Sequence, residues 1–148
     1  MELEGEFLVP LSRQVVYNFF MDPHKFGKAI PDVEELNVLD NDSFMARVRV
    51  GISYIKGSLG MQFERVAAED GQAATYRGKG LGMGSFAEVE ASFRLEDLQD
   101  GGTRVKWRGE AKIGGRLAGM GGGLLEPVAR KNTTRFITAI EAGLRDMT

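Results

Sequence analysis

The chain has 148 residues and a formal net charge of −2, with 19 basic residues against 21 acidic ones. Its length suits one domain over residues 1–148, and its composition is that of an ordinary globular protein. The balanced charge gives no pull toward nucleic acid. Because the chain has no cysteine and a single histidine, His24, we expect no disulfide, no metal and no cofactor.

The N-terminal residues lack the layout of a signal peptide. No apolar run reaches the ~20 residues that span a bilayer. We therefore expect a soluble, cytoplasmic protein.

The first third of the chain predicts a strand followed by short helices. Residues 2–9 alternate between apolar and acidic side chains, the period of a half-buried strand, and Pro10 ends it. Ser12 is suited to cap a helix that runs to about Met21. Residues 22–33 are interrupted by proline and glycine, so they predict a turn with at most one or two helical turns.

From residue 43 to residue 113 the period is two. The segment TRVKWRGEAKI, residues 103–113, is typical, because apolar or small residues alternate strictly with charged ones. Such charged outer faces predict an antiparallel sheet that is wetted on one side. Within it, alternate glycines from Gly78 to Gly84 clear one face of a strand, which favours either room for a ligand or a crossing helix, or sheet curvature.

The last third predicts one long amphipathic helix. Its glycine-rich approach, GGRLAGMGGGLLEPVARK, lacks the lysine and hydroxyl spacing of a phosphate-binding loop. We interpret Gly121–Gly123 as the hinge of a mobile gate, with Pro127 bending the helix near Glu126.

One helix cannot fill the concave side of a curved sheet of this size, so we predict a pocket between the two. The expected lining residues are Phe20, Ile30, Val48, Val50, Leu59, Met61, Met83, Trp107, Leu117, Met120, Leu124 and Val128.

No paired carboxylates and no Ser-His-Asp set occur, so we name no catalytic residue and predict a binding protein for an apolar small molecule. Two alternatives remain open. One is an enzyme of the cyclase or hydratase type that uses Tyr54, Tyr76 or Asn132 in the same pocket. The other is a recruitment protein whose apolar patch, residues 117–125, docks an oxidoreductase.

Three short stretches carry a resemblance to a known family. They are Ile30-Pro31 after the first helices, the VGI of residues 50–52, and KIGGRLA leading to VARK. With them, nearly the whole chain resembles the G-subunit family of carbon monoxide dehydrogenase, within the superfamily of polyketide cyclases, lipid-transfer proteins and plant allergens (START, Bet v 1-like, SRPBCC). Members often carry cysteine before Ile-Pro and glycine after it, where this chain has Ala29 and Asp32.

The resemblance implies an α+β helix-grip fold, in which a curved antiparallel sheet of about seven strands wraps a long C-terminal helix. It also implies an apolar cavity and a lipid- or quinone-like ligand. As partners it implies a molybdenum-containing carbon monoxide dehydrogenase and a membrane. Many members end in a membrane tail, but this chain ends at Thr148 just after the helix, so we expect at most peripheral membrane contact.

Overall fold

The computed structural model describes residues 1–120 and 122–147, so Gly121 of the predicted hinge lies outside the described residues. The elements follow the predicted order of strand, short helices, strands and long helix. They are β1 (Glu2–Val9), α1 (Arg13–Met21), α2 (Pro23–Lys28), β2 (Val33–Val38), β3 (Ser43–Ile52), β4 (Ile55–Glu69), β5 (Ala73–Gly82), β6 (Ser85–Asp97), β7 (Thr103–Gly115), the 3-10 turn η1 (Ala118–Met120) and α3 (Gly122–Arg145).

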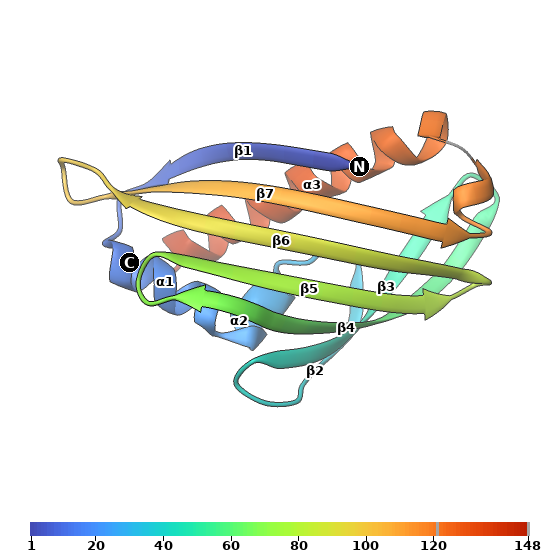
Figure 1. Cartoon of the computed structure of the whole chain (residues 1–148), viewed down its shortest axis with the longest axis horizontal. Coiled ribbons are helices and arrows are strands. Elements are labelled where there is room, and N and C mark those ends of the chain that lie inside the picture. The colour runs from blue at the N-terminus through green and yellow to red at the C-terminus, as the bar shows by residue number, and fades with distance from the viewer. Residues whose placement is uncertain (121, 148) are drawn as a thin grey trace.

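The strands form one seven-stranded sheet in the order β1-β7-β6-β5-β4-β3-β2. Every neighbouring pair is antiparallel, and β2 to β7 follow one another as hairpins. The sheet curves, and α3 runs across its concave side behind β1, β7 and β6 in the view of Figure 1. This confirms the predicted fold class.

Residue Asp22 links the two short helices. Ser12 caps α1 as predicted, since its hydroxyl accepts from the backbone N–H of Val15. The backbone N–H of Asp22 donates to the carbonyl of Phe19 at the end of α1. The Asp22 carboxylate then accepts from the backbone N–H groups of His24 and Lys25, which caps α2.

An aromatic cluster fills the concave side of the sheet at the end where α1 and α2 lie. Phe26 of α2 stacks on Tyr76 of β5 with ring centroids 4.1 Å apart. Phe20 stacks on Phe93 at 4.3 Å, and Phe136 of α3 meets Phe26 edge to face. Such ring pairs stabilise beyond the area that they bury, so this end of the protein is its packed core.

The long helix α3 does not press evenly on the sheet. Its C-terminal half is tightly packed, because Ile140 and Leu144 are fully buried and the phenyl ring of Phe19 lies against Gly143. Its backbone approaches β1 and β3, near the two edges of the sheet, more than the central strands. The helix therefore bridges the sheet and stands off from its middle.

Candidate ligand-binding site

Small side chains cover the concave face of the sheet opposite the first half of α3. The strand register places Leu3, Gly109 and Ala91 in one row across β1, β7 and β6. Ala111 and Val89 form the next row. All five are only partly buried, although they point toward the inside of the protein.

Gly109 shows that there is open space above this face. A Cβ atom built on Gly109 would meet no other atom within 4 Å. Core glycines in a packed interior have close neighbours. The surface formed by Leu3, Val89, Ala91, Gly109 and Ala111 is therefore the floor of a hollow, and we call it the small-residue floor.

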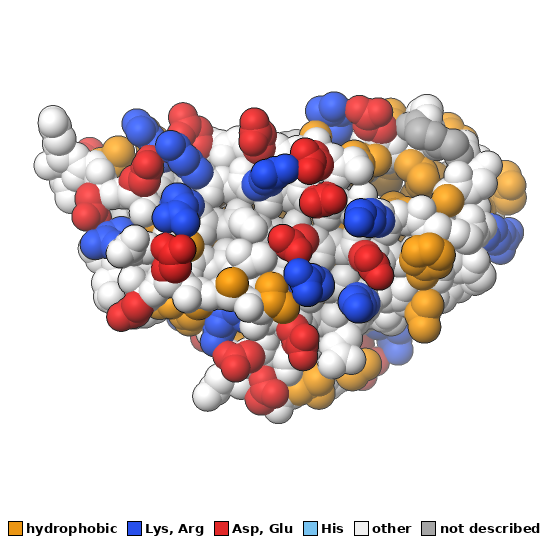
Figure 2. Space-filling model, viewed as in Figure 1, with side chains coloured by type: hydrophobic (Ala, Val, Ile, Leu, Met, Phe, Trp, Pro, Cys, Tyr) orange, Lys and Arg blue, Asp and Glu red, His pale blue; other side chains and the backbone are white. Residues whose placement is uncertain are grey.

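The first half of α3 lies above this floor. Leu125 is buried, while Val128, Ala129 and Asn132 are only partly buried. Figure 2 shows a depression lined by hydrophobic side chains beside the start of α3, on the side of the molecule that carries β1 and β7. The hollow thus communicates with solvent near the N-terminal end of the helix.

Trp107 forms the wall between the hollow and the aromatic cluster. Its indole lies over Gly5 of β1, so closely that a side chain at that position would collide with the ring. It is also paired across the strands with buried Phe93. Trp107 was predicted to line the pocket; it lies beside the small-residue floor, and whether it contacts a ligand stays a prediction.

The other predicted lining residues are placed unevenly. Those in the buried core are Phe20, Leu59, Met61 and Leu117. Those that are partly buried against the core are Ile30, Val48, Val50, Met83 and Met120. Val128 is half-buried on α3, and Leu124 is 49% exposed. Whether these residues touch a ligand stays a prediction.

The glycines of β5 leave room that neighbouring side chains occupy. The thioether of Met61 lies over Gly80, and the ring of Phe63 lies over Gly78. Across the hairpin, Met83 lies in the same way over Gly57. The space that these glycines create therefore holds strand side chains, and no crossing helix fills it.

None of the five residues of the small-residue floor was among the predicted lining residues. The strict alternation of residues 103–113 indicates that Gly109 and Ala111 face inward. A small inward-facing residue does not by itself indicate a cavity, because a neighbouring side chain can fill the space. Leu3 and Ala91 join them only through the register of three strands.

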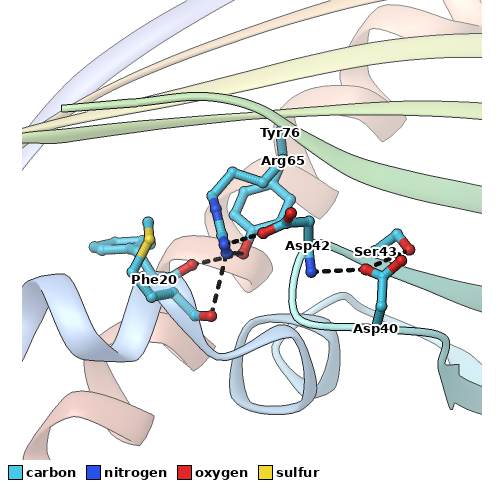
Figure 3. A network of polar contacts seen from close by, with 7 residues as sticks. Phe20, Asp40, Asp42, Ser43, Arg65 and Tyr76 are labelled. Atoms are coloured by element: carbon cyan, nitrogen blue, oxygen red, sulfur yellow. Dashed lines mark hydrogen bonds and ion pairs between the residues drawn. The ribbon is translucent and has the colours of Figure 1, made fainter. Parts of the chain in front are cut away.

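Tyr76 is one of three candidates for an enzymatic role, but its side chain makes hydrogen bonds that stabilise the fold. Its hydroxyl donates to the carbonyl of Phe20 at 2.6 Å and accepts from Arg65. Arg65 also donates to the carbonyl of Met21 and pairs with Asp42 (Figure 3). Burial raises the pKa of Tyr76. The network satisfies carbonyls at the end of α1, which the helix leaves without partners.

The other two candidates for an enzymatic role, Tyr54 and Asn132, differ in how far they are buried. Tyr54 is 78% exposed at the turn between β3 and β4. Asn132 is half-buried on α3, and its amide oxygen accepts a hydrogen bond from Arg135 at 3.3 Å.

An ion pair holds α3 to the turn before β2. Arg135 donates two hydrogen bonds to Asp32, at 2.9 and 3.0 Å. The hydrogen bond from Arg135 keeps the pKa of Asp32 below its ordinary value of 3.8, and the same bond raises the pKa of Arg135. Asp32 has a φ of 61°, in the left-handed region that favours glycine, and glycine is the residue that the resembled family often carries there.

Exposed apolar side chains gather at one end of the molecule. They lie at the β3–β4 turn, at the β5–β6 turn and at the start of α3, and are Tyr54, Leu81, Phe86 and Leu124. We call them the apolar tip. In Figure 2 hydrophobic side chains mark this end, on the right of the view. Basic residues lie in or just after the strands that lead to this end, namely Lys56, Lys79, Lys112 and Arg116, and Glu88 stands opposite both Lys79 and Lys112 in the register.

Two further hollows are present, and the first of them also borders Trp107. One, of about 390 Å³, lies over β4 to β7 and is bordered by Thr75, Ser92 and Arg108. The other, of about 590 Å³, lies between the α1–α2 junction and the β2–β3 turn, bordered by Met21 and Asn41. Both are open to solvent and combine polar and apolar side chains, so they lack the apolar enclosure of a site for a hydrophobic ligand.

Within residues 1–120 and 122–147, no three His, Cys, Asp or Glu side chains come together in a way that could hold a metal ion. Among these described residues, no helix is both long and apolar enough to cross a membrane.

Comparison with solved structures defines the class of the fold. A conserved protein from Geobacillus kaustophilus superposes with a TM-score of 0.84 at 22% identity, over 99% of this chain and 96% of that one. A START superfamily protein from Mycobacterium smegmatis gives 0.72 at 11% identity, over 99% of both chains. The Zhui aromatase/cyclase from Streptomyces sp. R1128 gives 0.68 at 13% identity, over 98% of this chain and 93% of that one. The protein therefore has the START-like helix-grip fold.

The sequence places the chain more narrowly within that class. Residues 5–145 match CoxG, the G-subunit family of carbon monoxide dehydrogenase. This chain belongs to that family, which confirms the resemblance found in its motifs. No curated protein matches the sequence.

Proposed function

We propose that this protein binds an apolar small molecule, quinone- or lipid-like, between α3 and the small-residue floor, and carries it to a partner. The observation that carries the proposal is the open space above Gly109, on an apolar face that is only partly buried beneath a helix. Apolar surface of this kind gains about 25 cal/mol for each Å² that a ligand covers. Micromolar binding therefore needs no more than a modest contact area.

The polar side chains favour binding over catalysis. Tyr76 makes hydrogen bonds within the fold, and Tyr54 lies at an exposed turn. An acid or base in the hollow would have to come from elsewhere, since the third candidate, Asn132, has an amide that does not titrate at ordinary pH.

The single tryptophan makes the proposal directly testable. Trp107 is the chain's one tryptophan and stands at the wall of the hollow, so its fluorescence reports on whatever enters. We expect a short-tailed isoprenoid naphthoquinone or oleic acid to change this emission saturably at micromolar concentration. Mass spectrometry of solvent extracts from natively purified protein should reveal a bound apolar molecule. Empty protein whose emission responds to neither probe contradicts the proposal.

We further propose that the ligand is exchanged at the apolar tip. Its exposed apolar side chains and the basic residues beside them suit a negatively charged, partly apolar surface. An anionic membrane has this chemistry, and so does an acidic face of a molybdenum-containing carbon monoxide dehydrogenase, the partner that the family name suggests.

Two measurements separate these partners. Sedimentation with phosphatidylglycerol vesicles, compared with uncharged phosphatidylcholine vesicles, tests peripheral membrane contact. Co-purification of a molybdenum enzyme with the tagged chain tests the other. The double variant Leu81→Ser, Phe86→Ser should weaken whichever contact exists, and an unchanged contact in that variant rules out the apolar tip.

A further inference from the structure

The ion pair between Asp32 and Arg135 joins α3 to the edge of the sheet that lies farthest from the small-residue floor. Its two hydrogen bonds, at 2.9 and 3.0 Å, form a fork between the guanidinium and the carboxylate. Asp32 lies in the turn before β2, and its carbonyl accepts from the backbone N–H of Arg49 in β3 at 2.9 Å. The floor belongs to β1, β7 and β6, at the other end of the strand order. The ion pair therefore ties α3 to the side of the sheet away from the hollow.

This ion pair is an isolated polar link between α3 and the rest of the protein. Within the described residues 123–144 of α3, no other group makes a hydrogen bond or an ion pair with another element. The remaining polar contacts of this span, such as that of Glu126 with Arg130, run along the helix itself. Phe136, the residue after Arg135, begins the packed half of α3, because its ring lies against the aromatic cluster. The ion pair thus fixes the sideways position of α3 at the border between its two halves.

The first half of α3 has a physical reason to settle on the floor. The floor carries only small or aliphatic side chains, and Leu125, Val128 and Ala129 above it are apolar and at least half-buried. Apolar surfaces on either side of a gap gain free energy when they meet. A glycine such as Gly109 also lets another backbone come close. A contact elsewhere must therefore hold α3 off the floor.

Asp32 has a backbone conformation that costs free energy for an aspartate. Its φ of 61° lies in the left-handed region, which glycine adopts without strain. The turn by itself would be better served by glycine, and what aspartate adds is the carboxylate that Arg135 binds. The ion pair, and not the turn, accounts for the residue at this position.

We infer that Asp32 and Arg135 form a tether that holds α3 toward the β2 edge, and so keeps the hollow above the small-residue floor open to a ligand. This inference rests on the proposed ligand-binding function. The two are positioning residues, because they act through the place of α3 and not by contact with the ligand. A ligand then meets a site that is already open, so that little of the binding free energy is lost in moving the helix.

Two single variants remove the tether from either end. Arg135→Met keeps the length of the side chain, and Asp32→Asn keeps a residue that tolerates the left-handed region but removes the charge. Each should weaken binding of the uncharged isoprenoid naphthoquinone by about three- to fivefold, the upper range of what an exposed ion pair contributes. The double variant should lose no more than either single variant. Arg135→Lys, which keeps an ion pair, should recover most of the affinity.

Arg130→Met is the matched control. It removes the same charge from α3 and breaks the ion pair with Glu126, also at 2.9 Å, but that pair lies within the helix. The control should bind the naphthoquinone as the wild type does. Its thermal midpoint should be no higher than those of the tether variants, because a helix that settles on the floor buries apolar surface and offsets the lost ion pair.

Nuclear Overhauser effects report on the position of α3 without any ligand. In the ligand-free tether variants, those between methyl groups of the first half of α3 and the methyl groups of Ala91 and Ala111 should strengthen relative to the wild type. In Arg130→Met they should stay as in the wild type.

The outcomes separate this inference from the proposed function. If both tether variants bind the naphthoquinone as tightly as the wild type, or if Arg130→Met loses as much affinity, the tether is wrong while the ligand site stands. A lower thermal midpoint with unchanged affinity would make the ion pair an ordinary stabilising contact. If neither the naphthoquinone nor oleic acid binds the wild type, the proposed function fails. The methyl contacts then decide by themselves whether Asp32 and Arg135 hold α3 off the floor, and unchanged contacts overturn the tether.

Discussion

The two halves of the concave face differ in what fills them. At the α1–α2 end, large rings from both short helices, the sheet and α3 interlock, and the end of α1 is tied down by Tyr76 and Arg65. At the other end the sheet presents glycine and alanine, and α3 stands off from them. The same curved sheet therefore provides a rigid core in one half and a binding surface in the other.

This difference indicates that one half of the concave face stabilises the fold and the other half is available to bind a ligand. Loss of a ring from the packed half leaves a cavity that the surroundings cannot close. Addition of a side chain to the open half removes a space that the fold does not need. Stability should therefore be sensitive to changes in one half, and ligand affinity to changes in the other.

The largest effect is expected for Phe26→Ala in the packed half. Phe26 meets Phe20, Phe44, Tyr76, Phe93 and Phe136, so its removal should lower the free energy of unfolding by about 3–5 kcal/mol. Urea denaturation followed by circular dichroism measures this. As a control, Phe86→Ala, on the outer face of the sheet, should cost under about 1 kcal/mol. A small loss for Phe26→Ala would show that the aromatic cluster is not the core.

The next effect is expected for Gly109→Leu in the open half. The new side chain would project into the hollow without meeting the existing structure, so unfolding should be little changed. Ligand affinity, read from Trp107 fluorescence, should fall by about tenfold or more, because the side chain excludes the ligand.

Gly51→Leu is the matched control for this variant. Gly51 likewise has no atom within 4 Å of a built Cβ, but it is exposed on the outer face of β3. It should leave affinity unchanged. Equal losses in both variants would place the ligand somewhere other than the small-residue floor.

The smallest effect is expected for Gly123→Ala at the start of α3. Gly123 has open space around it, so alanine fits and should stabilise the helix by about 1 kcal/mol. If the first turn must loosen for exchange, ligand dissociation should slow by about fivefold at nearly constant affinity. Stopped-flow displacement of the bound naphthoquinone measures this rate. Unchanged dissociation would leave the glycine as a packing detail and remove the argument for a gate.

The sequence predicts much of the fold because its patterns are local. Alternation over residues 103–113 and helical spacing over residues 117–144 identify β7 and α3, and Ser12 caps α1 as its residue type suggests. The sequence pattern did not predict the strand β2. Its burial does not alternate, because an irregularity between Val33 and Glu35 shifts its register against β3.

The candidate site is less predictable, because it depends on contacts between distant segments. The sequence indicated that Trp107 and Met61 point inward, but it did not indicate that each lies over a glycine of the neighbouring strand, Gly5 and Gly80. Tyr76 and Asn132 looked alike as polar residues near a pocket. Only the positions of Phe20 and Arg65 commit Tyr76 to the core, and only Asp32, a hundred residues from Arg135, fixes the amide of Asn132.

By itself, then, the sequence determined the order of the elements, the inward face of each and the family, because periodicity and short motifs are properties of neighbouring residues. The tertiary structure decided where space remains. Empty volume is a difference between what a curved sheet encloses and what side chains from seven strands and three helices fill. That difference depends on the register and on the distance of α3 from the sheet, which no single segment specifies.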